Sequence, residues 1–142
     1  MDETVLSLAS LAFNELEAFV ELMFLAAHAD GIVAPEELAA FRGQVIARTA
    51  GTLDAVMIDA MLAQVEKQAL ANDTETRLAK IRDRLKDPRK RHAALVHAAR
   101  VVLADSVLAL DEVAFLGRAL AFLGEPADRV STLLAEAREE VV

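Results

Sequence analysis

Four acidic residues occupy matched positions in two distant parts of the chain. Asp30 and Glu37 are repeated as Asp105 and Glu112, and both pairs are offset by 75 residues (105 − 30 and 112 − 37). In each copy an apolar, helix-like run ends at the aspartate, two aliphatic residues follow, and an acidic pair opens the next apolar run. The pattern predicts two similar helix-to-helix corners that carry carboxylates.

Binding of a divalent cation is one chemistry that these corners could support. Carboxylate oxygens are the ligands that Ca²⁺, Mg²⁺ and Mn²⁺ prefer, and Zn²⁺ also accepts them. Carboxylates that converge without a cation or protons between them repel one another. If the corners meet, the four residues form one metal site, with Glu36 and Asp111 beside it as extra ligands. The alternating ligands of an EF-hand loop are absent, so the site is of another kind.

A purely structural role explains the same residues. An aspartate in the last turn of a helix lies at the negative end of the helix dipole, which costs about 0.3–1 kcal/mol when exposed. Asp30 and Asp105 would offset this cost by accepting hydrogen bonds from backbone N–H groups of the turn. Glu37 and Glu112 are placed to reach back over the corner. The residues leave the metal-binding and the structural interpretation open.

Helical periodicity runs along the chain and predicts the elements that position these corners. No segment alternates apolar and polar residues as a half-buried strand would. We therefore expect an all-α, compact bundle of about seven helices with an internal pseudo-repeat. The helices before the two corners are expected to pack side by side, so that a pseudo-twofold brings the corners near each other. The segments expected to be helical are 2–29, 35–49, 53–70, 74–86, 88–104, 110–123 and 126–140.

Composition bounds the fold and the chemistry. The 142 residues are expected to form a single domain, 1–142. Hydrophobic residues make up 55% of the chain but aromatic residues only 4%, so the core must consist mainly of Ala, Leu and Val. The absence of cysteine excludes disulfides, thiolate chemistry and Cys-ligated metal sites. Since the chain also lacks a Gly-rich phosphate loop and a metalloprotease or nucleophile motif, we expect no enzymatic activity.

Neither the start of the chain nor its most apolar stretch predicts secretion or membrane insertion. The sequence begins with the acidic run Met1-Asp2-Glu3, whereas a secretory signal begins with positive charge. The most apolar stretch, 18–29, contains Glu21 and His28 and is too short to span a bilayer. A soluble, cytoplasmic protein without a transmembrane segment is expected.

Charge is distributed unevenly along the chain. The net charge is −8, residues 1–41 contain eight acidic and no basic residues, and 77–100 hold nine of the fifteen Lys and Arg. No aromatic residue interleaves these basic residues for stacking on bases, so a nucleic-acid interface is not expected. We interpret the basic segment as a solvated face.

Other polar residues are interpreted as surface or structural. Glu17 and Glu21 lie one turn apart and are assigned to a solvent-facing stripe of the first helix. His92 and His97 are five residues apart, which does not align them on one helical face as a metal-binding pair would be. His28 lies in the last turn of a predicted helix. We expect all three histidines to be non-catalytic.

The repeated pattern resembles the TerB-like family, which includes tellurite-resistance TerB proteins and the N-terminal domain of DjlA-type co-chaperones. The matching residues are Ala29-Asp30-Gly31-Ile32 with Glu37, and Ala104-Asp105 with Val107 and Glu112. The chain departs from the family in carrying Ser106 where the second glycine usually stands. The resemblance covers nearly the whole chain and implies an all-helical fold of about seven helices.

The resemblance also implies a function. It indicates a non-enzymatic domain that binds metal through these acidic positions and acts in stress-related complexes, in a tellurite-resistance-like setting. The alternative is a helical protein–protein interaction module, similar to a co-chaperone domain, whose acidic corners are only structural. Both interpretations imply a protein partner that the sequence does not identify.

Overall fold

The protein is all-helical in the part that the structure describes. The computed structural model describes residues 12–27, 54–71, 73–104 and 110–139, together with 39, 42, 43, 45 and 46. No β-strand occurs within these ranges, which confirms the predicted all-α fold. The elements are α1 (Phe13–Ala27), α3 (Ala55–Ala71), α4 (Thr74–Arg84), α5 (Pro88–Ala104), α6 (Leu110–Phe122), the 3-10 helix η2 (Ala127–Arg129) and α7 (Val130–Glu139).

Most helix boundaries agree with the periodicity. The helix α5 spans the predicted residues, and α3, α4 and α6 agree with the predicted ranges to within two residues at each end. The described residues contain six α-helices, one fewer than predicted. The difference falls on the predicted helix 35–49, of which only 39, 42, 43, 45 and 46 are described, all of them helical. The predicted start of the first helix lies outside the described residues.

Aspartate side chains cap the N-termini of three helices. The first backbone N–H groups of a helix have no partner within it, and a side-chain oxygen just before the helix can accept from them. The carboxylates of Asp54, Asp73 and Asp87 each accept a hydrogen bond from a backbone N–H two or three residues further on, at 2.9, 2.8 and 2.9 Å. These caps precede α3, α4 and α5, and they explain why those helices begin where the sequence predicts.

A glycine ends α6 and turns the chain toward α7. Gly124 has φ +88°, a conformation that costs glycine no steric strain. The backbone N–H of Glu125 donates to the Leu120 carbonyl at 2.8 Å, and that of Gly124 donates to the Ala121 carbonyl at 3.2 Å. This pair of bonds satisfies the last carbonyl groups of the helix.

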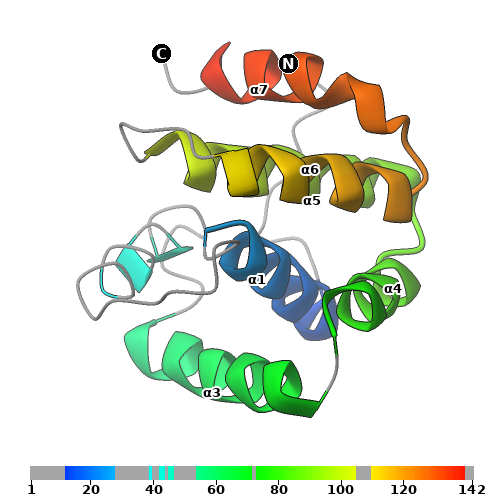
Figure 1. Ribbon diagram of the computed structural model, residues 1–142. Helices are drawn as coiled ribbons and strands as arrows, with labels where there is room; N and C mark the ends of the chain where they lie inside the picture. The colour runs from blue at the N-terminus through cyan, green and yellow to red at the C-terminus, as the bar shows by residue number, and fades with distance from the viewer. Residues whose placement is uncertain are drawn as a thin grey trace.

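The helices are stacked in layers in Figure 1, with α7 at the top, α5 and α6 below it, then α1 and α4, and α3 at the bottom. The helix α5 packs against both α1 and α7, and α1 also contacts α3 and α4. In the described part of the chain, no helix is both long and apolar enough to cross a membrane. The largest fully buried side chains are Phe19, Leu22, Met23, Ile58, Leu78, Ile81, Leu85, Leu95, Leu116 and Leu120.

Candidate functional site

The two helices that lead into the predicted corners, α1 and α5, pack side by side and run in the same direction. Near their starts, Lys90 Nζ donates to Glu15 Oε2 at 2.7 Å, and further along the ring centroids of Phe19 and His97 lie 6.0 Å apart. The carboxyl ends of both helices therefore lie on the same side of the molecule, the left of Figure 1. The predicted side-by-side packing of these helices is confirmed.

The contact between α1 and α5 also follows the internal repeat. Glu15 and Lys90 are 75 residues apart, the same offset as the two corners. Residues at equivalent positions of two repeats meet when they lie close to a pseudo-twofold axis. The ion pair is therefore the contact expected of two repeats that are arranged side by side.

One of the four predicted metal ligands falls among the described residues. Asp30, Glu37 and Asp105 lie outside them, so the structure does not test whether the corners converge. Glu112 lies in the first turn of α6 and is 6% exposed, whereas its neighbour Asp111 is exposed. The positive end of the helix dipole favours a carboxylate at that position. Within the described ranges, no three His, Cys, Asp or Glu side chains are grouped to hold a metal.

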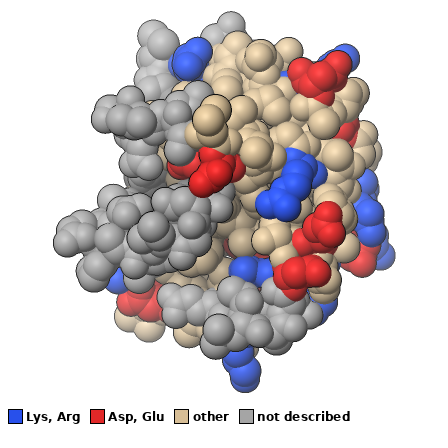
Figure 2. All heavy atoms as spheres, in the orientation of Figure 1, with Lys and Arg blue, Asp and Glu red and all other residues tan. Residues whose placement is uncertain are grey.

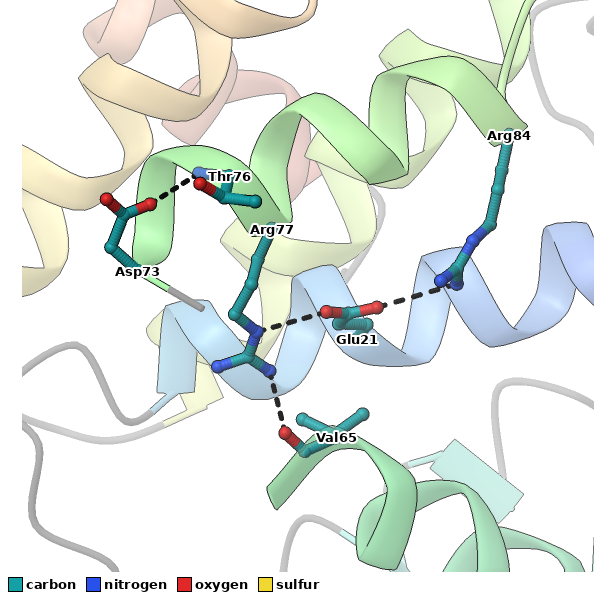
Figure 3. A network of polar contacts seen from close by, with 6 residues as sticks. All are labelled: Glu21, Val65, Asp73, Thr76, Arg77 and Arg84. Carbon is teal, nitrogen blue, oxygen red and sulfur yellow. Dashed lines mark hydrogen bonds and ion pairs between the residues drawn. The ribbon is translucent and has the colours of Figure 1, made fainter. Parts of the chain in front are cut away.

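A buried charge network joins α1, α3 and α4, and the sequence did not predict it. Arg77 Nε donates to Glu21 Oε2 at 3.2 Å, and Arg77 Nη2 donates to the Val65 carbonyl at 3.2 Å. Arg84 Nη1 approaches the other oxygen of Glu21, Oε1, at 3.5 Å. Figure 3 shows Glu21 between the two guanidinium groups.

The assignment of Glu21 to a solvent-facing stripe is wrong, because Glu21 is only 5% exposed. The physical reason is that α1 is covered on that side by α3 and α4, and Arg77 compensates the buried charge. Glu17, one turn earlier, is half-buried. A signal for this burial was present: a carboxylate stands in the middle of the most apolar helix, where burial needs a charged partner.

The interpretation of 77–100 as a solvated face is wrong for Arg77, which is 5% exposed. The basic residues after it also make specific contacts. Arg91 donates from Nε to the Leu85 carbonyl and from Nη2 to the Arg82 carbonyl at 3.2 Å, which closes the end of α4. On the face drawn in Figure 2, the Lys and Arg side chains of the described residues are interspersed with Asp and Glu rather than gathered in one area.

In a comparison with known protein families, one family matches most of the chain. The family described as tellurite resistance protein TerB matches residues 16–133, from α1 into α7. The chain belongs to the TerB family. The match includes both predicted corners and confirms the resemblance seen in the repeated pattern. No curated protein and no solved structure gives a match.

A second charge network joins α5 to the turn after α6 and to α7. His92 Nδ1 lies 3.0 Å from Glu125 Oε2, and His92 Nε2 lies 2.9 Å from Glu136 Oε2 on α7. Only a doubly protonated imidazole donates to both carboxylates. Burial lowers the pKa of His92, but the hydrogen bonds to Glu136 and Glu125 outweigh it, so the pKa is raised above its ordinary value.

The ion pair between the two repeats of the TerB domain also shifts a pKa. The hydrogen bond from Lys90 and that from the Ala12 backbone N–H lower the pKa of Glu15. Glu15 is therefore a carboxylate over a wider pH range in the folded protein than in the unfolded chain. The pair ties the start of α1 to the start of α5.

Proposed function

We propose that this TerB domain is a non-enzymatic module that binds a divalent cation through Asp30, Glu37, Asp105 and Glu112. The observation that carries the proposal is the parallel packing of α1 and α5, which brings the carboxyl ends of both helices to one side of the molecule. The 75-residue offset of the Glu15–Lys90 contact supports a pseudo-twofold relation between the two corners.

The chemistry of the four ligands favours a hard cation. All four side chains offer only carboxylate oxygens, which suit Ca²⁺, Mg²⁺ and Mn²⁺. Zn²⁺ binds most often through nitrogen and sulfur, so four carboxylates are not expected to favour it over the other three cations. Glu112 is 6% exposed, and a cation held by it would be partly withdrawn from water. The bound ion would compensate the mutual repulsion of the carboxylates.

The cation would act as a clamp between the two repeats. By joining a ligand pair from each repeat, it would stabilise one arrangement of the helices, and that arrangement would be the form recognised by a protein partner. We place this activity in the cytoplasm, without catalysis, in a tellurite-resistance-like stress response, and the family match supports the last of these.

Thermal unfolding of the full chain with EDTA and with each cation tests the proposal. A ligand that binds only the folded state stabilises it by about 2.7 kcal/mol at a free concentration of about 100 times Kd, so Ca²⁺, Mg²⁺ or Mn²⁺ should raise Tm by several degrees. The double variant Asp30→Asn/Asp105→Asn should lose this increase. The matched control Asp83→Asn/Asp128→Asn removes the same charge from two exposed positions and should retain it.

The rival function is a protein-interaction module with structural corners, and the same melts distinguish it. In that case no cation changes Tm of the wild type, and Asp30→Asn/Asp105→Asn lowers Tm equally with cation or with EDTA. Partner capture that decreases with salt but is unaffected by EDTA would support this rival and contradict the cation clamp.

A further inference from the structure

A cavity of about 180 Å³ opens between α1, α3 and the end of α4, beside the Glu21 network. An engineered cavity of about 150 Å³ in another protein holds benzene, so this one can accept a ligand of about six heavy atoms. The described residues that line this cavity are Glu17, Glu21, Met61, Gln64, Val65 and Arg84.

Two polar groups that line the cavity have open hydrogen-bonding capacity. Neither the Glu17 carboxylate nor the Gln64 amide makes a side-chain hydrogen bond or ion pair with any residue that the structure describes. Glu17 precedes Glu21 by one helical turn, which places both carboxylates on the same face of α1. The cavity therefore offers acceptor oxygens from two helices, α1 and α3.

The two arginines of the network differ in how firmly they hold Glu21. The Arg77 side chain is 5% exposed and is fixed by two hydrogen bonds of 3.2 Å. The Arg84 side chain is 35% exposed and makes one contact of 3.5 Å, at the outer limit of a hydrogen bond. Arg77 thus compensates the buried carboxylate, whereas the contact of Arg84 at the cavity costs little to break.

The charge and shape of the lining point to a cationic ligand. Among the described lining residues, Glu17 carries the carboxylate that has no partner, because Arg77 compensates Glu21 and Arg84 also contacts it. An ammonium group has three N–H donors, which matches the acceptors of Glu17, Glu21 and Gln64. Met61 and Val65 are buried and provide apolar surface for a short alkyl chain. We propose that this cavity binds the ammonium end of a primary alkylamine and that the ligand displaces Arg84 from Glu21.

Titration of the ¹⁵N-labelled full chain with three ligands of similar shape tests this proposal. n-Pentylammonium should shift the side-chain amide signals of Gln64 in a saturable manner. 1-Pentanol, which lacks the charge, and pentanoate, which reverses it, should leave those signals unshifted at the same concentration. Equal shifts with 1-pentanol, or shifts with pentanoate instead, would overturn the proposal.

The source of the amine is distinguished by a further arm of the titration. Nα-acetyl-lysine amide presents the same ammonium on a lysine side chain. If it shifts the Gln64 signals as n-pentylammonium does, the cavity accepts a lysine of a partner protein. If only n-pentylammonium does so, the ligand is a free amine.

Three variants locate the binding. Glu17→Gln should weaken n-pentylammonium binding about tenfold, because it replaces a charge-assisted hydrogen bond by a neutral one. Arg84→Gln should tighten binding, because it removes the competing cation. The control Glu75→Gln, at an exposed position of α4, should change nothing.

Because Glu17 has no partner within the described residues, Glu17→Gln should leave the urea midpoint unchanged, so weaker binding cannot be attributed to unfolding. Unchanged affinity in Glu17→Gln, or weaker binding in Arg84→Gln, contradicts the assignment. The cation clamp at the corners is tested separately, by metal-dependent melting, so either proposal can fail alone.

Discussion

The two charge networks of this TerB domain are built in opposite ways. In the first, the carboxylate of Glu21 lies between the guanidinium groups of Arg77 and Arg84. In the second, the imidazole of His92 lies between the carboxylates of Glu125 and Glu136. The side chain of Glu21 is 7% exposed and that of His92 is 35% exposed. The first network is therefore part of the core, and the second is close to the solvent.

The two networks also differ in the cations that they contain. Arginine stays charged throughout the neutral pH range, so the guanidinium groups that hold Glu21 and join α1, α3 and α4 do not change their charge there. Histidine titrates near neutral pH, so the contact of His92 with α7 depends on the proton concentration. The comparison separates a connection made by arginine from one that depends on the proton of a histidine.

The largest effect should come from breaking the buried network. Arg77→Met leaves Glu21 as a buried carboxylate without its closest partner, and such a change costs about 3–5 kcal/mol. Urea unfolding at pH 7 measures the loss. The control Arg82→Met, at a more exposed position of the same helix, should change the free energy of unfolding by no more than about 0.5 kcal/mol.

A double variant sharpens this result. Replacing both members of a buried ion pair by apolar residues is often neutral or stabilising. Glu21→Met/Arg77→Met should therefore be more stable than Arg77→Met alone. If the single variant is as stable as the wild type, the network does not hold the core and the contrast with His92 disappears.

The same comparison explains what the sequence could predict. Helix positions follow from local signals, and the caps at Asp54, Asp73 and Asp87 and the turn at Gly124 are all within a few residues of what they terminate. The matched pattern of the two repeats was also enough to predict that the helices before the corners pack together.

The charge networks could not be predicted in this way, because their members are far apart in the chain. Glu21 and Arg77 are separated by 56 residues, and His92 is 33 and 44 residues from its two carboxylates. Periodicity places a charged residue on a helix face but does not say which other helix covers that face. Periodicity alone therefore places Glu21 on a solvent-facing stripe and gives His92 no partners.

The second effect should come from removing the charge at His92. His92→Gln loses the two charge-assisted contacts that hold α7, each worth about 0.2–1 kcal/mol at a partly exposed site. Relative to the wild type, the variant should show a larger increase in amide hydrogen-exchange rates in α7 than in α3. The control Arg138→Gln removes an exposed cation from α7 itself and should leave that exchange unchanged.

The pH dependence of the His92 contacts has a definite sign. The folded-state pKa of His92 is raised, so its stabilisation is fully present below the unfolded pKa of about 6.5 and is lost as pH rises through the folded value. The difference in free energy of unfolding between wild type and His92→Gln should be largest near pH 6 and should vanish in alkaline buffer. A difference that grows with pH would contradict the assignment of an imidazolium.

The smallest effect should come from the ion pair between the repeats, which lies between the two networks in burial. The side chains of Lys90 and Glu15 are 30% and 15% exposed, and Lys90→Met should cost about 0.2–1 kcal/mol, less at high salt. The sign with pH is opposite to that of His92. Because the hydrogen bond from Lys90 lowers the pKa of Glu15, the stabilisation is present above the unfolded pKa and is lost as pH falls through the folded value.

Urea unfolding of Lys90→Met at pH 7 and at acidic pH measures what the ion pair contributes to the free energy of unfolding. Lys80→Met, at an exposed position, is the control. The cost of Lys90→Met should be seen at pH 7 and should shrink in acid, while Lys80→Met should cost little at either pH. An equal cost at both pH values would mean that Lys90 stabilises α5 by packing of its alkyl chain and not by its charge. The contact at the 75-residue offset would then be a packing contact between the repeats, and the pH-dependent connections would be confined to His92 and α7.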